Sequence, residues 1–173
     1  MNNMPWYGYH AYLNEFIKEN NCSKIMEIGV YNGENAISMI NAATKRSPPH
    51  LVEYFGFDFF KRYNINQITE KLRQTGCKFK LFQGDTLDTL PKIVDNLPKM
   101  DVIFIDGGKS YKEAMNDWRN SAKLMHGKTG VFVHNAGFSG VRRTIDEIPE
   151  DRYKLDIFSP PGEGLVAHIK EIE

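Results

Sequence analysis

The stretch KIMEIGVYNGENA (residues 24–36) decides how this chain folds. It begins as an apolar run with one acid, passes through two glycines and continues in a helical pattern, so it predicts a strand, a tight loop and a helix N-terminus. A helix N-terminus presents unpaired N–H groups and the positive end of the helix dipole. Gly29 and Gly33 would let the backbone bend sharply and approach a ligand closely. The stretch therefore predicts a ligand-binding loop.

The spacing of the two glycines distinguishes two kinds of nucleotide site. The dinucleotide fingerprint is G-x-G-x-x-G, whereas this loop is G-x-x-x-G with an acid two places before the first glycine. The E-x-G-x-x-x-G spacing resembles the first motif of class I S-adenosylmethionine (SAM)-dependent methyltransferases, in which the loop holds the amino-acid end of SAM. That resemblance implies SAM contacts from Glu27, Gly29, Val30, Tyr31 and Gly33. A loop that only turns a strand into a helix stays the alternative interpretation.

Length and composition limit the classes of protein to consider. A chain of 173 residues fits one domain, expected over residues 1–173. The formal net charge is zero and no basic block is present, so electrostatics give no support for nucleic-acid binding. Cys22 and Cys77 lie far apart without CxxC spacing, which argues against a zinc ribbon or a disulfide scaffold and fits a reducing cytoplasm.

The first residues carry a helical pattern and no targeting signal. The start MNNMPWYGYH lacks the pattern of a signal peptide, and no apolar run approaches the length of a membrane span, so we expect a cytoplasmic protein without a membrane partner. Apolar groups recur at helical spacing around residues 8–20 and predict an amphipathic helix. The segment 1–21 could pack on the domain or close over a ligand as a lid. A neighbouring subunit could cover the pocket instead, so a homo-oligomer is an open expectation.

Strands and helices alternate along the chain and then give way to a hairpin. Strands are expected at residues 24–28, 53–58, 78–83, 101–106 and 131–133, and helices at 34–45, 63–74, 87–95, 111–125 and 141–148. Two final strands, 153–158 and 164–169, have no helix between them and should pair antiparallel. The pattern predicts an α/β fold with a mostly parallel seven-stranded sheet, helices on both faces and a C-terminal antiparallel hairpin. The closing hairpin is similar to the Rossmann-like methyltransferase fold, whereas a dinucleotide dehydrogenase would continue to a sixth parallel strand.

Polar residues follow the second and third strands, where α/β sheets bind ligands. Asp58 is well placed to accept hydrogen bonds from both ribose hydroxyls, and Phe59 could lie against the adenine ring, whereas Phe60 is expected in the core. The third strand ends in Gly84-Asp85-Thr86. In the methyltransferase plan the acid here meets the adenine amino group. Asp85 could equally cap the next helix, and both roles can hold together.

The fourth and fifth strands deliver the residues expected to carry chemistry. Asp106, Lys109, His134 and Asn135 should converge beside the methyl group of SAM, because their strands should be neighbours. The blocks FIDGGKSY and GVFVHNAG resemble a branch of class I enzymes with the pattern F-I-D-G-x-H-S-Y followed by G-V-x-x-x-H-D. That branch includes metal-assisted O-methyltransferases acting on sugars and other small hydroxylated molecules. The similarity covers the chain from about Lys24 to Asn135.

The resemblance implies a role for each of these four residues. Asp106 matches an acid that binds a divalent cation or the SAM amino group, and His134 and Asn135 fall on the pair that completes the metal site in some members. Lys109 stands where the branch usually has histidine and is a candidate general base, a role that needs a lowered pKa. Asn135 replaces an acid and His134 offers nitrogen, so the set suits manganese, iron or zinc better than magnesium, or holds no metal.

The remaining polar residues carry weaker signals. His10, His50, His126 and His168 are scattered without ligand spacing, so we expect solvated or core roles for them. Arg142-Arg143 is expected on a helix surface.

These observations lead to three functional hypotheses. The first is transfer of a methyl group from SAM to an oxygen, less readily a nitrogen, of a small-molecule acceptor. The second is a degenerate relative that binds SAM or a nucleoside and regulates or scaffolds a partner, a hypothesis prompted by Lys109 and Asn135. The third is a NAD-linked oxidoreductase.

Overall fold

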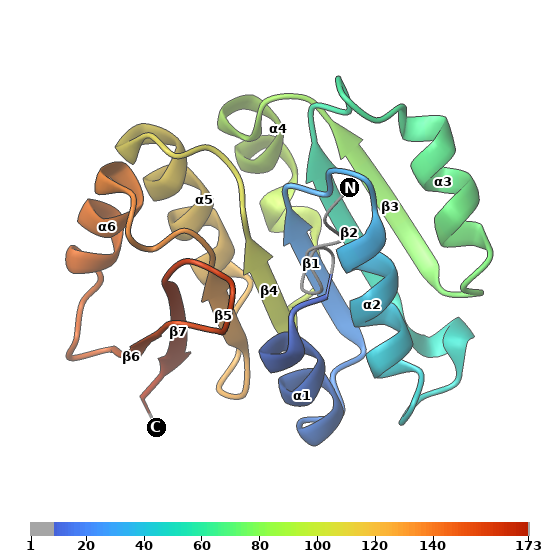
Figure 1. Cartoon of the computed structure of the whole chain (residues 1–173), viewed down its shortest axis with the longest axis horizontal. Helices are drawn as coiled ribbons and strands as arrows, with labels where there is room; N and C mark the ends of the chain where they lie inside the picture. The colour runs from blue at the N-terminus through green and yellow to red at the C-terminus, as the bar shows by residue number, and fades with distance from the viewer. Residues whose placement is uncertain (1–8, 173) are drawn as a thin grey trace.

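The computed structural model describes residues 9–172, and residues 1–8 and 173 lie outside this range (Figure 1). The strands of the described chain are β1 (Lys24–Ile28), β2 (Glu53–Asp58), β3 (Lys78–Gln83), β4 (Val102–Ile105), β5 (Gly130–Val133), β6 (Tyr153–Phe158) and β7 (Val166–Glu171). Its helices are α1 (Ala11–Glu19), α2 (Glu34–Ala43), α3 (Ile65–Arg73), α4 (Thr86–Ile93), α5 (Tyr111–Lys123) and α6 (Ser139–Asp146), with short 3₁₀ turns at Pro49–Leu51 and Val94–Asn96.

All seven strands join one sheet in the order β3-β2-β1-β4-β5-β7-β6. The first five strands pair in parallel, and β7 runs antiparallel to both β5 and β6. The predicted mostly parallel sheet with a C-terminal antiparallel hairpin is therefore confirmed. The strand order reverses between β1 and β4, and open α/β sheets bind ligands in the crevice beyond the carboxyl ends at such a point.

Helices cover both faces of the sheet, as Figure 1 shows. One core joins α1, α2 and α3 to the sheet, and the other joins α4, α5 and α6 to the opposite face. Side chains of β1 alternate between these cores, with Ile25 on the first side and Met26 and Ile28 on the second. All four residues of β4 are buried, because a parallel strand in this position is covered on both faces.

Element boundaries agree closely with those predicted, and the differences have local causes. Strands β1, β2 and β3 have the predicted bounds. Helix α3 begins at Ile65, two residues late, because the Asn64 side chain caps it by accepting a hydrogen bond from the Asn66 backbone. The last strand was predicted at residues 164–169 and lies at Val166–Glu171, because its register is set by pairing with β5 and β6.

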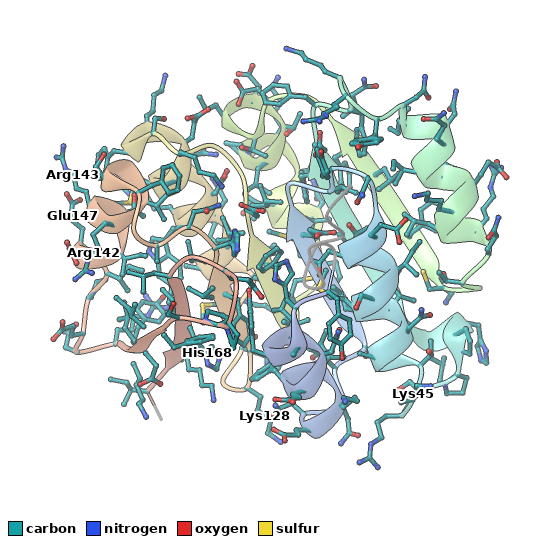
Figure 2. All side chains as sticks on the ribbon, in the orientation of Figure 1. Lys45, Lys128, Arg142, Arg143, Glu147 and His168 are labelled. Carbon is teal, nitrogen blue, oxygen red and sulfur yellow. The ribbon has the colours of Figure 1, made fainter. Side chains whose placement is uncertain are left out.

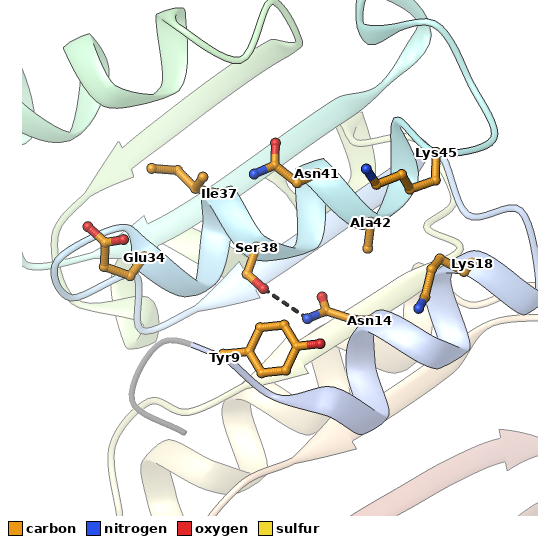
Figure 3. A pocket seen from close by; sticks show the side chains of 9 residues that line it. All are labelled: Tyr9, Asn14, Lys18, Glu34, Ile37, Ser38, Asn41, Ala42 and Lys45. Atoms are coloured by element: carbon orange, nitrogen blue, oxygen red, sulfur yellow. Dashed lines mark hydrogen bonds between the residues drawn. The ribbon is translucent and has the colours of Figure 1, made fainter. Parts of the chain in front are cut away.

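Helix α1 lies beside α2 and closes one side of a cavity of about 470 Å³ (Figure 3). The Asn14 amide donates a hydrogen bond to the Ser38 hydroxyl across the two helices, and Lys18 and Lys45 flank the far end of the cavity. The amphipathic helix expected around residues 8–20 is thus present over Ala11–Glu19. The first eight residues of the predicted lid segment lie outside the described residues. None of the helices in residues 9–172 is both long and apolar enough to cross a bilayer.

Candidate active site

The glycine loop is held tightly between the strands that flank β1. Gly29 has a φ of +91°, and a Cβ atom there would lie 2.3 Å from the carbonyl oxygen of Asp106, so no other residue fits. The Gly29 N–H donates to the carbonyl of Phe57 at 2.8 Å, and the Asp106 N–H donates to that of Ile28 at 2.8 Å. Gly33, with a φ of +79°, directly precedes α2. The loop is therefore fixed against the ends of β2 and β4.

Asp58 ties the glycine loop to the loop that follows β2. Its Oδ2 atom accepts a hydrogen bond from the Tyr31 N–H at 2.9 Å, and its Oδ1 atom accepts one from the Phe60 N–H at 2.8 Å. A carboxylate has about four acceptor positions, so capacity for further donors remains. Asp58 thus joins the two loops and also lines a cavity at the carboxyl ends of the strands with acceptor positions that these loops do not use.

Glu27 is buried beneath the loop. The Asn35 amide donates to its Oε1 atom at 2.8 Å, and the Tyr54 hydroxyl donates a short hydrogen bond to its Oε2 atom. Burial raises the pKa of Glu27 to about 8, although the hydrogen bonds from Tyr54 and Asn35 oppose this shift. The acid of the first motif therefore links β1 to α2 and β2.

A cavity of about 290 Å³ opens at the carboxyl ends of β1, β2, β4 and β5. Six of the residues predicted to bind the cofactor line it, namely Glu27, Gly29, Val30, Tyr31, Asp58 and Asp106. His134, predicted as a metal ligand, also lines it. The described structure thus brings together predicted residues from the carboxyl ends of four different strands.

The residues predicted around the adenine lie outside this cavity. The Phe59 side chain is 44% exposed, with the Lys61 ammonium 4.7 Å from its ring centroid. Phe60 is buried in the core, as expected. Asp85 caps α4 by accepting a hydrogen bond from the Leu87 N–H at 2.9 Å, which confirms its helix-capping role. Gly84 and Thr86 flank Asp85 at the end of β3, and the adenine contacts of this loop stay a prediction.

Asp106 is the centre of the predicted chemical group. Its Oδ1 atom lies 2.6 Å from the Lys109 ammonium, accepts a hydrogen bond from the Asn135 amide at 2.9 Å and lies 3.3 Å from Nδ1 of His134. Burial alone would raise the pKa of Asp106, but the neighbouring His134 and Lys109 outweigh it and hold that pKa below its usual value. All four predicted residues converge because β4 and β5 pair in parallel. Asn135 adopts a positive φ of 57° directly after β5.

Two further residues at this site had no signal in the sequence. Nδ1 of His10 lies 2.7 Å from Oε2 of Glu163, and Nε2 of His134 lies 3.4 Å from the same oxygen. The Tyr12 hydroxyl also donates to it at 3.3 Å. A solvated or a core position was expected for His10. Its side chain is buried, and it lines the cofactor cavity. Burial lowers the pKa of His10, although Glu163 opposes that shift.

The other polar residues singled out in the sequence lie on the surface or in the core. The His126 ring lies 3.0 Å from Asp101, and the His168 ring stacks on Phe132 with centroids 4.1 Å apart. His50 is exposed. Arg142 pairs with Asp146 near the end of α6 and Arg143 with Glu147 directly after it, on the surface of the molecule (Figure 2).

Comparison with known proteins identifies the fold and the family. Residues 26–136 match a family model described as a methyltransferase domain, and no curated protein sequence matches the chain. An O-methyltransferase from Bacillus cereus in complex with SAH superposes with a TM-score of 0.79 and 17% identity, over 96% of this chain and 81% of the other. TomG from Streptomyces achromogenes, an O-methyltransferase of tomaymycin synthesis solved with SAM, superposes with a TM-score of 0.74 and 17% identity, over 94% of this chain and 78% of TomG. CalS11, a TDP-rhamnose 3'-O-methyltransferase, superposes with a TM-score of 0.76 and 15% identity, over 98% of this chain and 84% of CalS11.

These findings agree with the features predicted from the sequence. The Bacillus cereus O-methyltransferase shares the fold over 96% of this chain. This chain has the predicted antiparallel strand after its parallel strands, which a dinucleotide dehydrogenase half would lack. The matched residues begin in β1 and end just after Asn135, so they include the glycine loop and every predicted site residue. The chain therefore belongs to the methyltransferase domain family and has the α/β fold of class I methyltransferases.

Proposed function

We propose that this chain transfers a methyl group from SAM to an oxygen atom of a small hydroxylated molecule. One observation carries the proposal: the cavity beyond β1 and β4 is bounded by the glycine loop, Asp58 and Asp106. Solved relatives of the same fold, described as O-methyltransferases and in two cases bound to SAM or SAH, support it.

The cofactor would lie across the glycine loop. Its amino-acid end would contact the loop and Asp106, and its ribose hydroxyls would donate to Asp58, whose carboxylate keeps unused acceptor positions. The adenine would extend toward Phe59 and the loop at residues 84–86. The positive end of the α2 dipole lies at the same loop and favours a carboxylate there.

The acceptor would enter through a second cavity, of about 540 Å³, between α1 and the loop after β6. Its lining includes Tyr12, Phe158, Pro160 and Pro161, with Glu15 and Glu163 as its two acids. Such a lining suits a hydroxylated acceptor that also carries an apolar or aromatic body.

Methyl transfer from a sulfonium is an in-line displacement, so much of the acceleration can come from holding the acceptor oxygen at the methyl group. The oxygen must also lose a proton, and Lys109 is our candidate base. In the described geometry Asp106 holds the Lys109 ammonium at 2.6 Å. Lys109 would therefore have to lose its own proton and leave this pair before it could accept one from the acceptor.

The resemblance also implied a metal ion on Asp106, His134 and Asn135. That set fits a cation poorly, because the Lys109 ammonium and the Asn135 amide nitrogen both occupy Oδ1 of Asp106. The branch-specific metal role of these three residues stays a prediction, and the proposed proton transfer uses Lys109 alone.

Single-turnover transfer of a labelled methyl group tests the proposal. The chain is mixed with SAM and a panel of hydroxylated and amine acceptors, and product is followed with Lys109→Met and the surface control Lys112→Met. We expect methylated oxygen, a rate at least about 100-fold lower for Lys109→Met and an unchanged rate for Lys112→Met. SAH binding without any methylated product would favour the regulatory or scaffold hypothesis instead.

A further inference from the structure

Three buried side chains from distant parts of the chain meet beside the cofactor cavity. His10 precedes α1, His134 follows β5, and Glu163 lies between β6 and β7. One ligand atom from each lies within 4.8 Å of the others. The exposed fractions of the three side chains are 7%, 10% and 3%. This set shares only His134 with the metal ligands that the sequence implied.

The side chain at the centre of this cluster has unused bonding capacity. Both ring nitrogens of His134 are buried, and neither makes a well-aligned hydrogen bond within the described residues. They lie at 3.3 Å from Asp106 and 3.4 Å from Glu163. Buried polar atoms are normally hydrogen-bonded, so an unsatisfied imidazole at a cavity wall points to an absent ligand.

We propose that His10, His134 and Glu163 bind a divalent transition-metal ion of the zinc type. Two imidazoles and one carboxylate, with at least one position left open, are a ligand set of catalytic zinc sites. Bonds of about 2.0–2.1 Å in a tetrahedral site place ligand atoms roughly 3.3 Å apart. The separation between His134 Nε2 and Glu163 Oε2 is already 3.4 Å. The hydrogen bond of 2.7 Å between His10 and Glu163 would open as the ion replaces its proton.

Asp106 supports the site from behind His134. A metal-ligating histidine commonly donates its other ring N–H to a carboxylate, which fixes the ring and its tautomer. With Nε2 of His134 turned to Glu163, Nδ1 lies 3.3 Å from Oδ1 of Asp106. Asp106 is thus a positioning residue for the metal ligand, while Asn135 has no part in holding the ion.

The open position of the ion would lie between the two cavities. His10 and His134 line the cofactor cavity, and Glu163 lines the apolar cavity beside α1. A hydroxyl bound to the ion would lose its proton more easily. This last consequence rests on the proposed methyl transfer, whereas the metal site itself does not.

Metal binding to the full chain tests the site without any cofactor or acceptor. The protein is treated with a chelator and titrated with Zn²⁺, Mn²⁺ and Mg²⁺ by calorimetry, and Co²⁺ is followed by its visible absorption. We expect one Zn²⁺ per chain, weaker Mn²⁺ binding, and a Co²⁺ spectrum typical of a tetrahedral site. Glu163→Gln and His10→Gln should each weaken Zn²⁺ binding at least about 100-fold, since each removes a ligand.

Two matched variants distinguish this site from a surface histidine and from the ligand set that the sequence implied. His50→Ala, at an exposed histidine, should bind Zn²⁺ as the unmodified chain does. Asn135→Gly keeps the positive φ at that position and should also leave binding within about threefold, whereas the ligand set implied by the sequence would lose the ion. Thermal unfolding without metal shows whether each variant is folded. The proposal is overturned if the unmodified chain binds no stoichiometric Zn²⁺, or if folded Glu163→Gln and His10→Gln bind it undiminished.

Discussion

Replacing Asp58 with alanine should weaken SAH binding as well as the fold, whereas a change of the same kind away from the cavity should weaken the fold alone. The carboxylate receives two backbone N–H groups, from Tyr31 and Phe60, and should receive two ribose hydroxyls from the cofactor. Hydrogen bonds to a charged group contribute about 1.5–3 kcal/mol each, and the lower value applies at this partly solvated edge. Losing both ribose contacts gives about 3 kcal/mol, which raises the Kd for SAH roughly 150-fold.

Asp101 offers a control at the opposite, amino-terminal end of strands β1 and β4. Its carboxylate also accepts two backbone N–H groups, from Ser23 and Lys24, each at 2.8 Å. Asp101 also contacts the His126 ring at 3.0 Å and the Ser23 hydroxyl at 3.3 Å, so Asp101→Ala should lower the free energy of unfolding at least as much as Asp58→Ala, each by roughly 1–3 kcal/mol. Calorimetric titration with SAH should give a raised Kd for Asp58→Ala alone. Equal SAH affinities in the two variants would refute the ribose-binding role.

Three further perturbations test the loop and two buried titratable groups. Gly29→Ala forces a Cβ atom to 2.3 Å from the Asp106 carbonyl at a φ of +91°, and should lower the free energy of unfolding by roughly 2–4 kcal/mol in urea titrations; a loss below about 0.5 kcal/mol would contradict the tight loop. Burial, reinforced by Lys170, lowers the pKa of His168 to about 4. The unfolded chain therefore protonates His168 at a higher pH than the folded chain does, so the free energy of unfolding should fall by up to about 3 kcal/mol as pH falls from about 6.5 to 4. Urea titrations of His168→Phe should lack this loss. Burial raises the pKa of Glu27 to about 8, so stability should decline as pH rises from 4.5 to 8, and Glu27→Gln should flatten that decline.

Much of the fold was predictable because its signals are local. The strands at 24–28, 53–58 and 78–83 have the predicted bounds, since apolar runs end at glycine or acid residues there. The grouping of Asp106 with His134 was also predictable, because parallel neighbours deliver their carboxyl ends to one edge of the sheet.

The contact between His10 and Glu163 could not be predicted from the sequence. These residues are 153 positions apart, and they meet only because β7 pairs antiparallel with β5 and returns the loop after β6 to the cavity. The same limit applies to Lys109. Its spacing three residues after Asp106 fits both a base facing the acceptor and an ion pair with that acid, and the loop conformation produces the pair.

Calorimetric titration of the unmodified chain with SAH, and then with NAD, examines most directly whether the crevice beyond β1 and β4 is a SAM site. We predict one SAH per chain, and NAD should bind more weakly and fail to displace it. No heat with SAH, or tighter binding of NAD, would contradict a SAM-binding cavity bounded by Asp58.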